Sequence, residues 1–141
     1  MYHMPRTDLI GLIKTGCGGF DDADAFLYEN YITTWNLTGR RLTEEDDYSM
    51  HPRGYIEAFS DEDLRILDAV NRVRVQILDT YAPFVEDISQ PHQTMADIAA
   101  RLYRFLEEQG IPQMLDERAS REEAFGDLSS AEETAQLWDI F

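Results

Sequence analysis

The stretch SDEDLRILDAVNRVRVQILDTY, residues 60–81, carries the strongest helical signal of the chain. Its apolar side chains recur at three- and four-residue steps, which places them on one face of an α-helix: Leu64, Leu67, Val70, Val73, Ile77 and Tyr81. Ser60 can cap the first turn, and the acidic residues after it suit the positive end of the helix dipole. The pattern predicts a long helix from Ser60 to about Tyr81, with Pro83 and Pro91 bracketing its end and the next connection.

Similar signals predict further helices on both sides of this one, over residues 8–14, 21–35, 94–109 and 112–124, and from residue 130 onward. Thr7 and Thr94 are the expected caps of the first and third, and Ser130 with Glu133 has the spacing of a capping box. The glycine-rich run 16–19 should end the first helix. In the second, apolar residues recur at helical spacing: Phe26, Leu27, Tyr31 and Trp35.

The helix over residues 94–109 has one strongly apolar face, made of Met95, Ile98, Ala99, Leu102, Phe105 and Leu106. Residues 36–55 are the least regular part and should form an exposed loop. Strand signals are few and no internal repeat occurs. The sequence therefore predicts an all-α, irregular multi-helix fold in a single domain covering residues 1–141.

Composition places the chain among ordinary globular proteins, with 43% hydrophobic and 11% aromatic residues over 141 positions. No apolar run is long enough to cross a bilayer and no signal peptide is evident, so we expect a cytoplasmic protein without a membrane partner. The formal net charge is −16. Because nucleic-acid binders usually present a basic surface, the isolated chain should bind DNA weakly or not at all. The acidic C-terminal third is either a set of solvated helix faces or a surface turned away from DNA.

Several short patterns suggest chemistry without completing it. Lys14-Thr15-Gly16 matches one motif of penicillin-binding proteins, but the companion serine-x-x-lysine motif is missing from the sequence. The same stretch lacks the glycine-lysine-serine/threonine ending of a phosphate-binding loop. The three histidines are far apart and Cys17 is the only cysteine. The acidic pairs at 46–47 and 61–63 fit a solvated loop and a helix start better than a Mg²⁺ site. We therefore predict no catalytic, nucleotide-binding or metal-binding residue.

Four residues are candidates for contact with DNA or a partner protein. Arg40 and Arg41 follow an aromatic-rich helix, where they can reach phosphates or carboxylates, or pair within the chain. Trp138 and Phe141 belong to an apolar end over residues 137–141, on a last helix that either is cut there or docks as a natural tail. Arg65, Arg72 and Arg74 flank the apolar stripe of the long helix. At least one of the last two should pair inside the domain, because residues two apart do not share a helix face.

Five stretches, taken in order, resemble one protein family. Residues 8–16, DLIGLIKTG, are similar to a "YLKTG" run, and residues 27–39, LYENYITTWNLTG, to "LENYVL..GI.G". Further along, AVNRVR at 69–74 resembles "iN.vR", LYRFLEEQGIP at 102–112 resembles "LY.FLE..gvp", and QLWD at 136–139 resembles "qvWd". The family is the B subunit of the bacterial ATP-dependent helicase/nuclease, also called AddB or RexB. The chain departs from it after Gly39, where the family usually has an aromatic residue.

The resemblance implies an internal fragment of a much larger subunit, similar to the helical 2B-type insertion of helicase-like proteins. It implies a structural role in an ATP-dependent exonuclease that resects double-strand DNA ends for recombinational repair, in complex with an A subunit and, through it, with DNA. ATP, Mg²⁺ and an iron–sulfur cluster would be held outside this region. A free-standing acidic adaptor for a partner protein is the alternative. An unrecognised hydrolase would need a convergent cleft of titratable groups.

Overall fold

Helices make up the regular structure of the computed structural model, which describes residues 5–42 and 46–138. In those ranges the elements are α1 (Arg6–Lys14), α2 (Asp22–Thr34), the 3₁₀ helix η1 (Gly39–Leu42), α3 (Asp61–Ile88), α4 (Met95–Glu108), α5 (Ile111–Ala124) and α6 (Leu128–Gln136). The described residues contain no β-strand, which confirms the predicted all-α class. None of their helices is long and apolar enough to cross a membrane.

The chain divides into two compact units, residues 1–83 and 84–141, with α3 running from the first into the second. Each unit is described by itself below. The prediction of a single domain stays a prediction.

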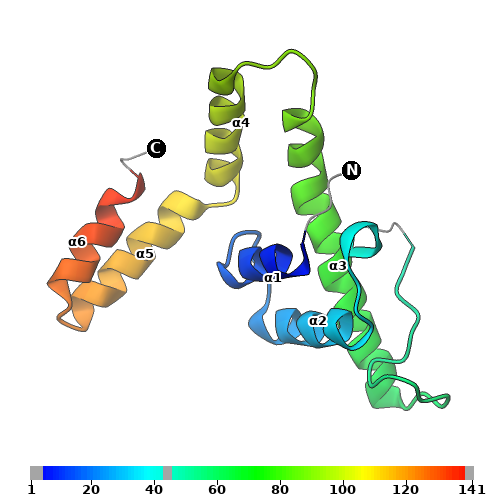
Figure 1. Ribbon diagram of the computed structural model, residues 1–141. Helices are drawn as coiled ribbons and strands as arrows, with labels where there is room; N and C mark the ends of the chain where they lie inside the picture. The colour runs from blue at the N-terminus through cyan, green and yellow to red at the C-terminus, as the bar shows by residue number, and fades with distance from the viewer. Residues whose placement is uncertain (1–4, 43–45, 139–141) are drawn as a thin grey trace. The chain divides into compact units, whose positions relative to one another are not determined.

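In the first unit, α1 and α2 are joined by a short turn and pack beside α3 (Figure 1). α2 begins where expected, because the Asp21 carboxylate accepts hydrogen bonds from the amides of Ala23 and Asp24, both at 3.0 Å. The core of the unit consists of side chains that are at most 9% exposed: Leu9, Ile13, Phe20, Tyr28, Tyr31, Ile32, Leu37, Leu42, Tyr48, Val70, Val73, Ile77 and Tyr81. It is therefore built from all three helices and from the loop after α2.

The glycine-rich turn between α1 and α2 is attached to α3 through backbone carbonyls. The Tyr81 hydroxyl donates to the carbonyl of Cys17 at 2.6 Å, and the Gln76 amide donates to that of Gly18 at 2.6 Å. Gly18 has φ +100°, and a Cβ there would lie 2.6 Å from a ring carbon of Phe20. The turn thus needs glycine at position 18 both for its backbone angle and for its close approach to the ring.

Three alanine substitutions in this region should separate these effects. Gly18→Ala is expected to lower the free energy of unfolding by about 2 kcal/mol, since left-handed strain and a steric clash add. Gly19→Ala, at φ +63° with no atom within 4 Å of the added Cβ, should cost about 1 kcal/mol from strain alone. Gly11→Ala, in open space on α1, should stabilise the chain by up to about 1 kcal/mol. Urea unfolding of the three variants measures the series, and equal losses at 18 and 19 would contradict the clash.

The long helix differs from its prediction at its C-terminal end. It starts after Ser60 as expected, but it continues through Pro83 to Ile88 instead of stopping near Tyr81. A proline fixes a helical φ and removes one amide donor, so a long, well-packed helix can tolerate it. The predicted inward stripe is right from Val70 to Tyr81 but wrong at Leu64, which is exposed.

Two predicted caps and one predicted stripe are also wrong. Thr7 lies inside α1, whose N-cap is Pro5, and Ser130 lies inside α6, whose N-cap Asp127 accepts the Ser130 amide at 3.2 Å. Asp127 stands three residues ahead of Ser130, which is the spacing at which a capping side chain accepts a backbone amide of the first turn. On α2, Tyr31 is buried as predicted, but Phe26 faces solvent while Tyr28 and Ile32 are buried, so the apolar face is rotated from the predicted one.

The loop over residues 36–55 is less exposed than predicted. It contains η1 and buries Leu37, Leu42 and Tyr48 in the core, because Gly39, at φ +56°, turns the chain back toward α2 and α3. Residues 43–45 lie outside the described part of the loop.

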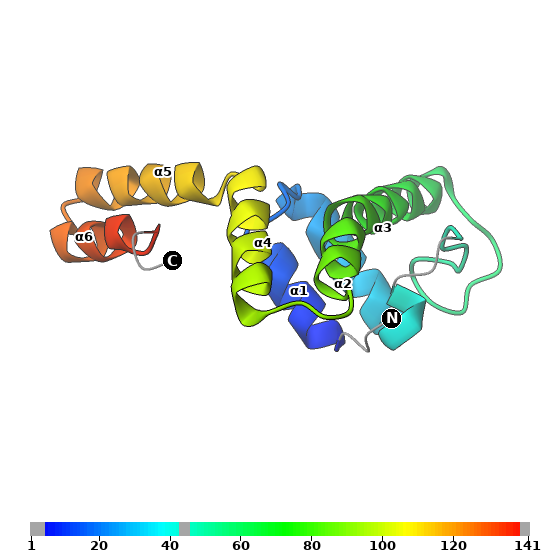
Figure 2. The same cartoon turned by 90° about the horizontal axis from the view of Figure 1, so that it is seen from above.

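The second unit consists of the end of α3 and helices α4 to α6. α4 begins with the predicted Thr94, which forms a capping box with Asp97. The Phe84 and Phe105 rings stack with centroids 4.4 Å apart. α5 and α6 lie side by side in both views (Figures 1 and 2), and Thr134 on α6 donates to Glu122 on α5 at 2.7 Å.

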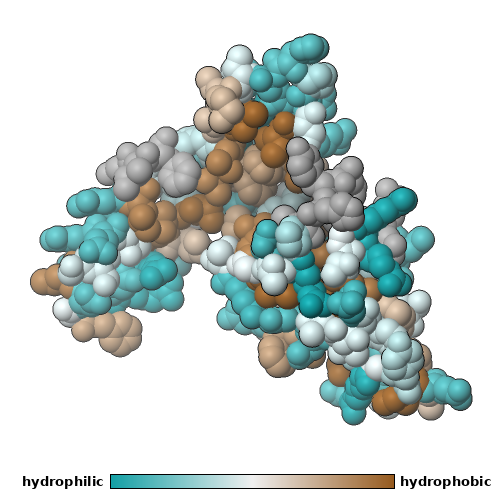
Figure 3. All heavy atoms as spheres, viewed as in Figure 1, coloured by the Kyte–Doolittle hydropathy of each residue, from teal (hydrophilic) through white to brown (hydrophobic). Residues whose placement is uncertain are grey.

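Burial is sparse in this second unit. Among residues 84–138, Thr134 is the only buried side chain. Apolar residues gather over α4 and the first part of α5 on the face shown in Figure 3. The predicted apolar face of α4 is present, but none of its residues reaches full burial.

Candidate functional site

A polar cluster holds the loop after η1 against α3. The Tyr48 amide donates to Asn71 Oδ1 at 2.8 Å, and Asn71 Nδ2 donates to the Tyr48 carbonyl at 2.9 Å. One side-chain amide thereby satisfies both backbone polar groups of Tyr48 without a neighbouring strand. We call Asp47, Tyr48, Asn71 and Arg74 the Tyr48 anchor.

Arg74 completes the Tyr48 anchor one helical turn after Asn71. Its side chain is 2% exposed, and its guanidinium pairs with the Asp47 carboxylate. Its Nε donates to Asn71 Oδ1 at 3.3 Å, and its Cζ lies 5.8 Å from the centroid of the Tyr48 ring. A buried guanidinium needs such partners because its desolvation is costly. The prediction that Arg72 or Arg74 pairs within the domain is confirmed for both, since Arg72 pairs with Asp24 at 2.9 Å. However, Arg74 is buried rather than flanking.

Tyrosine rings surround the anchor on the side of α2. The Tyr48 ring stacks on Tyr31 with centroids 5.3 Å apart, and on Tyr28 at 6.4 Å. The Met50 amide donates to the Tyr31 hydroxyl at 3.1 Å, and the Tyr48 hydroxyl donates to the carbonyl of Arg41 at 3.0 Å. Burial raises the pKa of Tyr31 to about 12 and that of Tyr28 further. The Tyr28 and Tyr31 phenols are therefore neutral rather than acid–base groups at physiological pH.

A second polar cluster forms at the start of α3. Ser60 and Asp63 form a capping box, with the Ser60 amide 2.9 Å and its hydroxyl 2.5 Å from Asp63 Oδ2. Arg53 Nε lies 2.8 Å from Asp63 Oδ1, and Nε2 of the buried His51 lies 3.4 Å from Oδ2. The Arg53 amide donates to His51 Nδ1 at 3.1 Å. These contacts tie the loop over residues 51–60 to the helix.

Acid should weaken this second cluster. Hydrogen bonds from Ser60, together with the charges of Arg53 and His51, lower the pKa of Asp63 in the folded chain. The stabilisation is therefore complete above the unfolded pKa of about 4 and is lost as the pH falls through the lower folded value. Asp63→Asn should make stability less dependent on pH below about 5. Urea unfolding at pH 7 and pH 3 tests this, with the exposed Glu57→Gln as control. An equal loss in the unchanged chain and Asp63→Asn would contradict it.

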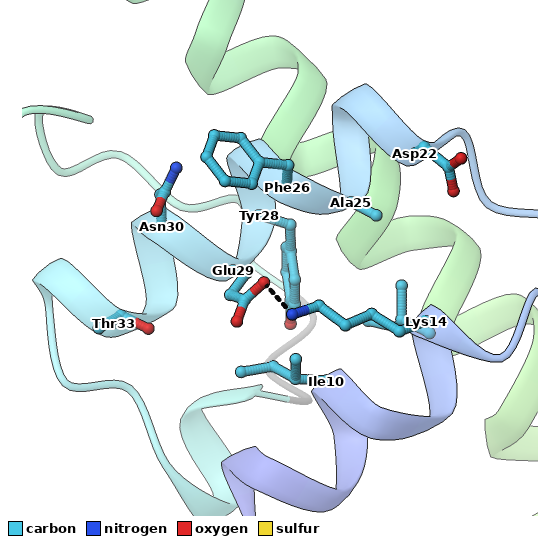
Figure 4. A pocket seen from close by; sticks show the side chains of 10 residues that line it. Ile10, Lys14, Asp22, Ala25, Phe26, Tyr28, Glu29, Asn30 and Thr33 are labelled. Atoms are coloured by element: carbon cyan, nitrogen blue, oxygen red, sulfur yellow. Dashed lines mark ion pairs between the residues drawn. The ribbon is translucent and has the colours of Figure 1, made fainter.

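A pocket of about 520 Å³ opens between α1 and α2. Ile10 and Ile13 from α1 and Tyr28 from α2 contribute apolar walls, and Lys14 reaches across to Glu29 at 2.7 Å (Figure 4). The ion pair brings together two of the stretches that carry the family resemblance. The Lys14–Glu29 pair is an exposed ion pair across the mouth of this pocket, and such pairs contribute little stability.

The residues present do not fit the cofactors that the family implies. An iron–sulfur cluster is usually held by four cysteine thiolates, whereas Cys17 is the only cysteine of the chain. Burial also raises the pKa of the Cys17 thiol, which disfavours the thiolate that binds metals. The described residues include no group of three or more His, Cys, Asp or Glu side chains placed to hold a metal ion.

The predicted contact residues lie in different elements. Arg40 and Arg41 are both exposed on η1, where the Arg41 carbonyl receives the Tyr48 hydroxyl, so the Tyr48 anchor also holds this turn. Trp138, a residue of the apolar end, packs against Tyr103 of α4 within the second unit, with ring centroids 4.9 Å apart. Phe141 lies outside the described residues. A contact of any of the four with DNA or a partner stays a prediction.

Comparison with known proteins gives one consistent result. The chain is 30% identical over 130 residues to the B subunit of the ATP-dependent helicase/deoxyribonuclease of Acetivibrio thermocellus, covering 90% of this chain and 11% of that protein. The proteins of the same name from a Thermoanaerobacter species and from Pediococcus pentosaceus are 29% and 27% identical, covering 91% and 99% of this chain but 11% and 13% of theirs. The chain is homologous to one segment of these B subunits. It spans about one ninth of their length. No protein-family model matches it.

The family-matching stretches supply much of the interior of the first unit, and two of them also line the pocket between α1 and α2. Stretch 27–39 buries Tyr28, Tyr31, Ile32 and Leu37, and stretch 69–74 provides Asn71 and Arg74. Sequence reasoning missed the Tyr48 anchor. The sign of it in the sequence is the polar pair Asn71 and Arg74, three residues apart beside the apolar stripe of the long helix.

Proposed function

We propose that this chain is a non-catalytic structural segment of the B subunit of an ATP-dependent helicase/deoxyribonuclease that resects double-strand DNA ends for recombinational repair. It would hold the shape of the helicase-like region, in the place of a helical 2B-type insertion. ATP, Mg²⁺ and the iron–sulfur cluster would be bound elsewhere in the complex.

One observation carries the proposal: two polar residues of a family-matching stretch, Asn71 and Arg74, are engaged in holding the fold. Both side chains bind the loop at Tyr48. A catalytic site would instead direct such groups into a cleft toward a substrate. Their use as internal ties supports a scaffold.

The partner expected for this scaffold is the A subunit of the complex, and DNA would be contacted through the assembled complex. The formal charge of −16 supports weak affinity of the chain itself for DNA. Of the predicted contact residues, the exposed Arg40 and Arg41 are the ones that phosphates would reach most easily.

A scaffold and a catalytic site respond differently to the same substitution. In the full-length subunit, Asn71→Ala should lower the amount of complex that assembles with the A subunit, while nuclease turnover per assembled complex stays within about twofold of normal. A loss of turnover in complexes of normal amount would overturn the scaffold role. Asn30→Ala, an exposed asparagine of α2, is the matched control.

The DNA part of the proposal is tested by titrating the chain with labelled double- and single-stranded DNA ends, with and without the A subunit. We expect binding to the A subunit and no binding to DNA alone at physiological salt. Micromolar affinity of the chain for DNA would overturn the expectation that the chain itself does not bind DNA. Loss of that affinity when Arg40 and Arg41 are both replaced by alanine would locate the contact at these two residues.

A further inference from the structure

α4 carries an apolar stripe that the described residues leave open. Four of its residues follow one another at steps of four, three and four positions, the spacing at which one helix packs along another: Met95, Ala99, Leu102 and Leu106. Met95 is 79% exposed, Ala99 is exposed, and the two leucines are only half-buried. We call these four residues the α4 stripe.

The neighbours of α4 contact it on either side of the α4 stripe. The Phe84 ring, near the end of α3, stacks on Phe105 with centroids 4.4 Å apart, and Trp138 packs against Tyr103 at 4.9 Å. With 3.6 residues per turn, Phe105 and Tyr103 flank the stripe on opposite sides. The helix is therefore held at both edges, while the line between them is open to one more packed helix.

The second unit needs more burial than it has. Among residues 84–138, Thr134 is the only buried side chain, and the apolar residues over α4 lie at the surface in Figure 3. A unit of about 60 residues has to hide about 60% of the surface that its unfolded chain exposes, in a core of its own. The unit is therefore completed by an element that covers the α4 stripe.

Charge and folding select that element. Residues 84–141 contain thirteen carboxylates and four arginines, so DNA or a second copy of this unit would be repelled. A separate subunit could cover the stripe only after assembly, and would leave it in water while the B subunit folds. A segment of the same polypeptide is present throughout folding, at a high effective concentration. The B subunits to which the chain is homologous are about nine times as long, which leaves ample polypeptide for this purpose.

We propose that the α4 stripe packs against an amphipathic helix of the same B-subunit polypeptide, from outside residues 1–141. That helix turns its own apolar residues, three and four positions apart, toward Met95, Leu102 and Leu106. Its backbone approaches α4 most closely at the small side chain of Ala99. This inference rests on the proposed scaffold role and deepens it, because it names the kind of element that the segment holds in place.

The test places a photo-crosslinking phenylalanine analogue at Met95 of the full-length B subunit. The protein is irradiated alone and with the A subunit, and the crosslinked peptides are identified by mass spectrometry. We expect the same main peptide in both samples, from the B subunit outside residues 1–141, with apolar residues at helical spacing. The same analogue at Phe125, which is 90% exposed in the same unit, should not give this peptide.

Two neighbouring alanines then test the packing itself. Ala99 and Ala100 are both exposed on α4, but Ala100 lies about 100° further around the helix, away from the stripe. Ala99→Phe should lower the crosslinking yield at Met95 at least threefold, because its ring keeps the second helix at a distance. Ala100→Phe should leave the yield unchanged. Both variants must keep the helical circular dichroism of the unchanged protein.

Crosslinks found only within residues 1–141, to the A subunit or to a second copy would overturn the inference, as would no crosslink at all. The crosslink is measured in the B subunit alone, so it depends neither on assembly with the A subunit nor on nuclease turnover. Its absence would remove the docked helix and leave the scaffold role standing. Loss of turnover in assembled Asn71→Ala complexes would overturn the scaffold role and leave the crosslink unaffected.

Discussion

Arg74→Ala is expected to lower the free energy of unfolding by about 4 kcal/mol, the largest effect that we anticipate for one substitution in this chain. The side chain is 2% exposed and contacts Asp47, Asn71 and the Tyr48 ring. Truncation removes these contacts and leaves a cavity in the middle of the first unit. Truncations of this size in a packed core typically cost about 2–5 kcal/mol. Urea unfolding followed by circular dichroism measures the change.

A second variant at the same position separates packing from charge. Arg74→Met keeps most of the volume but removes the guanidinium, and it should lie within about 1.5 kcal/mol of the unchanged chain. The reason is that Asp47 is 76% exposed and remains hydrated when its partner is lost, so no buried charge is stranded. If methionine were as damaging as alanine, the ion pair rather than the packing would be the source of the stability. Arg74 and Asn71 act on the same residue, Tyr48, so the Arg74 side chain also helps to fix the position of the loop at Tyr48.

Helix positions were largely predictable from the sequence because they depend on local patterns. The apolar steps of α3, the Thr94 cap of α4 and the glycines that follow α1 all act over a few residues. The errors arose where two local signals compete. Pro83 and the surrounding helical pattern disagree, and the helix continues through the proline, which has a helical φ and lacks only one amide donor. Asp127 and Ser130 are both good caps, and the earlier one was used.

The Tyr48 anchor could not be predicted in the same way. Asn71 and Tyr48 are 23 positions apart, and their two hydrogen bonds exist only after α2, η1 and α3 have packed. An asparagine on a helix is usually solvated or caps a neighbouring turn, so its residue type does not reveal a long-range backbone partner. The exposure of Leu64 was also hidden, since Leu64 follows the helical stripe but is 53% exposed in the first turn of α3.

Asn71→Ala is the second large prediction, with an expected loss of about 3 kcal/mol. It removes both hydrogen bonds between Asn71 and the Tyr48 backbone in a partly buried place. Removing one partner of a hydrogen bond in such a place costs about 1–3 kcal/mol. The Tyr48 amide should also lose protection in hydrogen exchange, whereas core amides of α3 should keep theirs.

Asn71→Asp separates the two bonds, because a carboxylate can accept from the Tyr48 amide and from Arg74 but cannot donate to the Tyr48 carbonyl. It should lose about half as much stability as Asn71→Ala. Asn30→Ala, at an exposed asparagine, should change stability by less than about 0.5 kcal/mol. Combining Asn71→Ala with Arg74→Ala should cost less than the two separate losses together, since both residues hold the same loop. Strict additivity would mean that they act independently, and the Tyr48 anchor would then not be one structural unit.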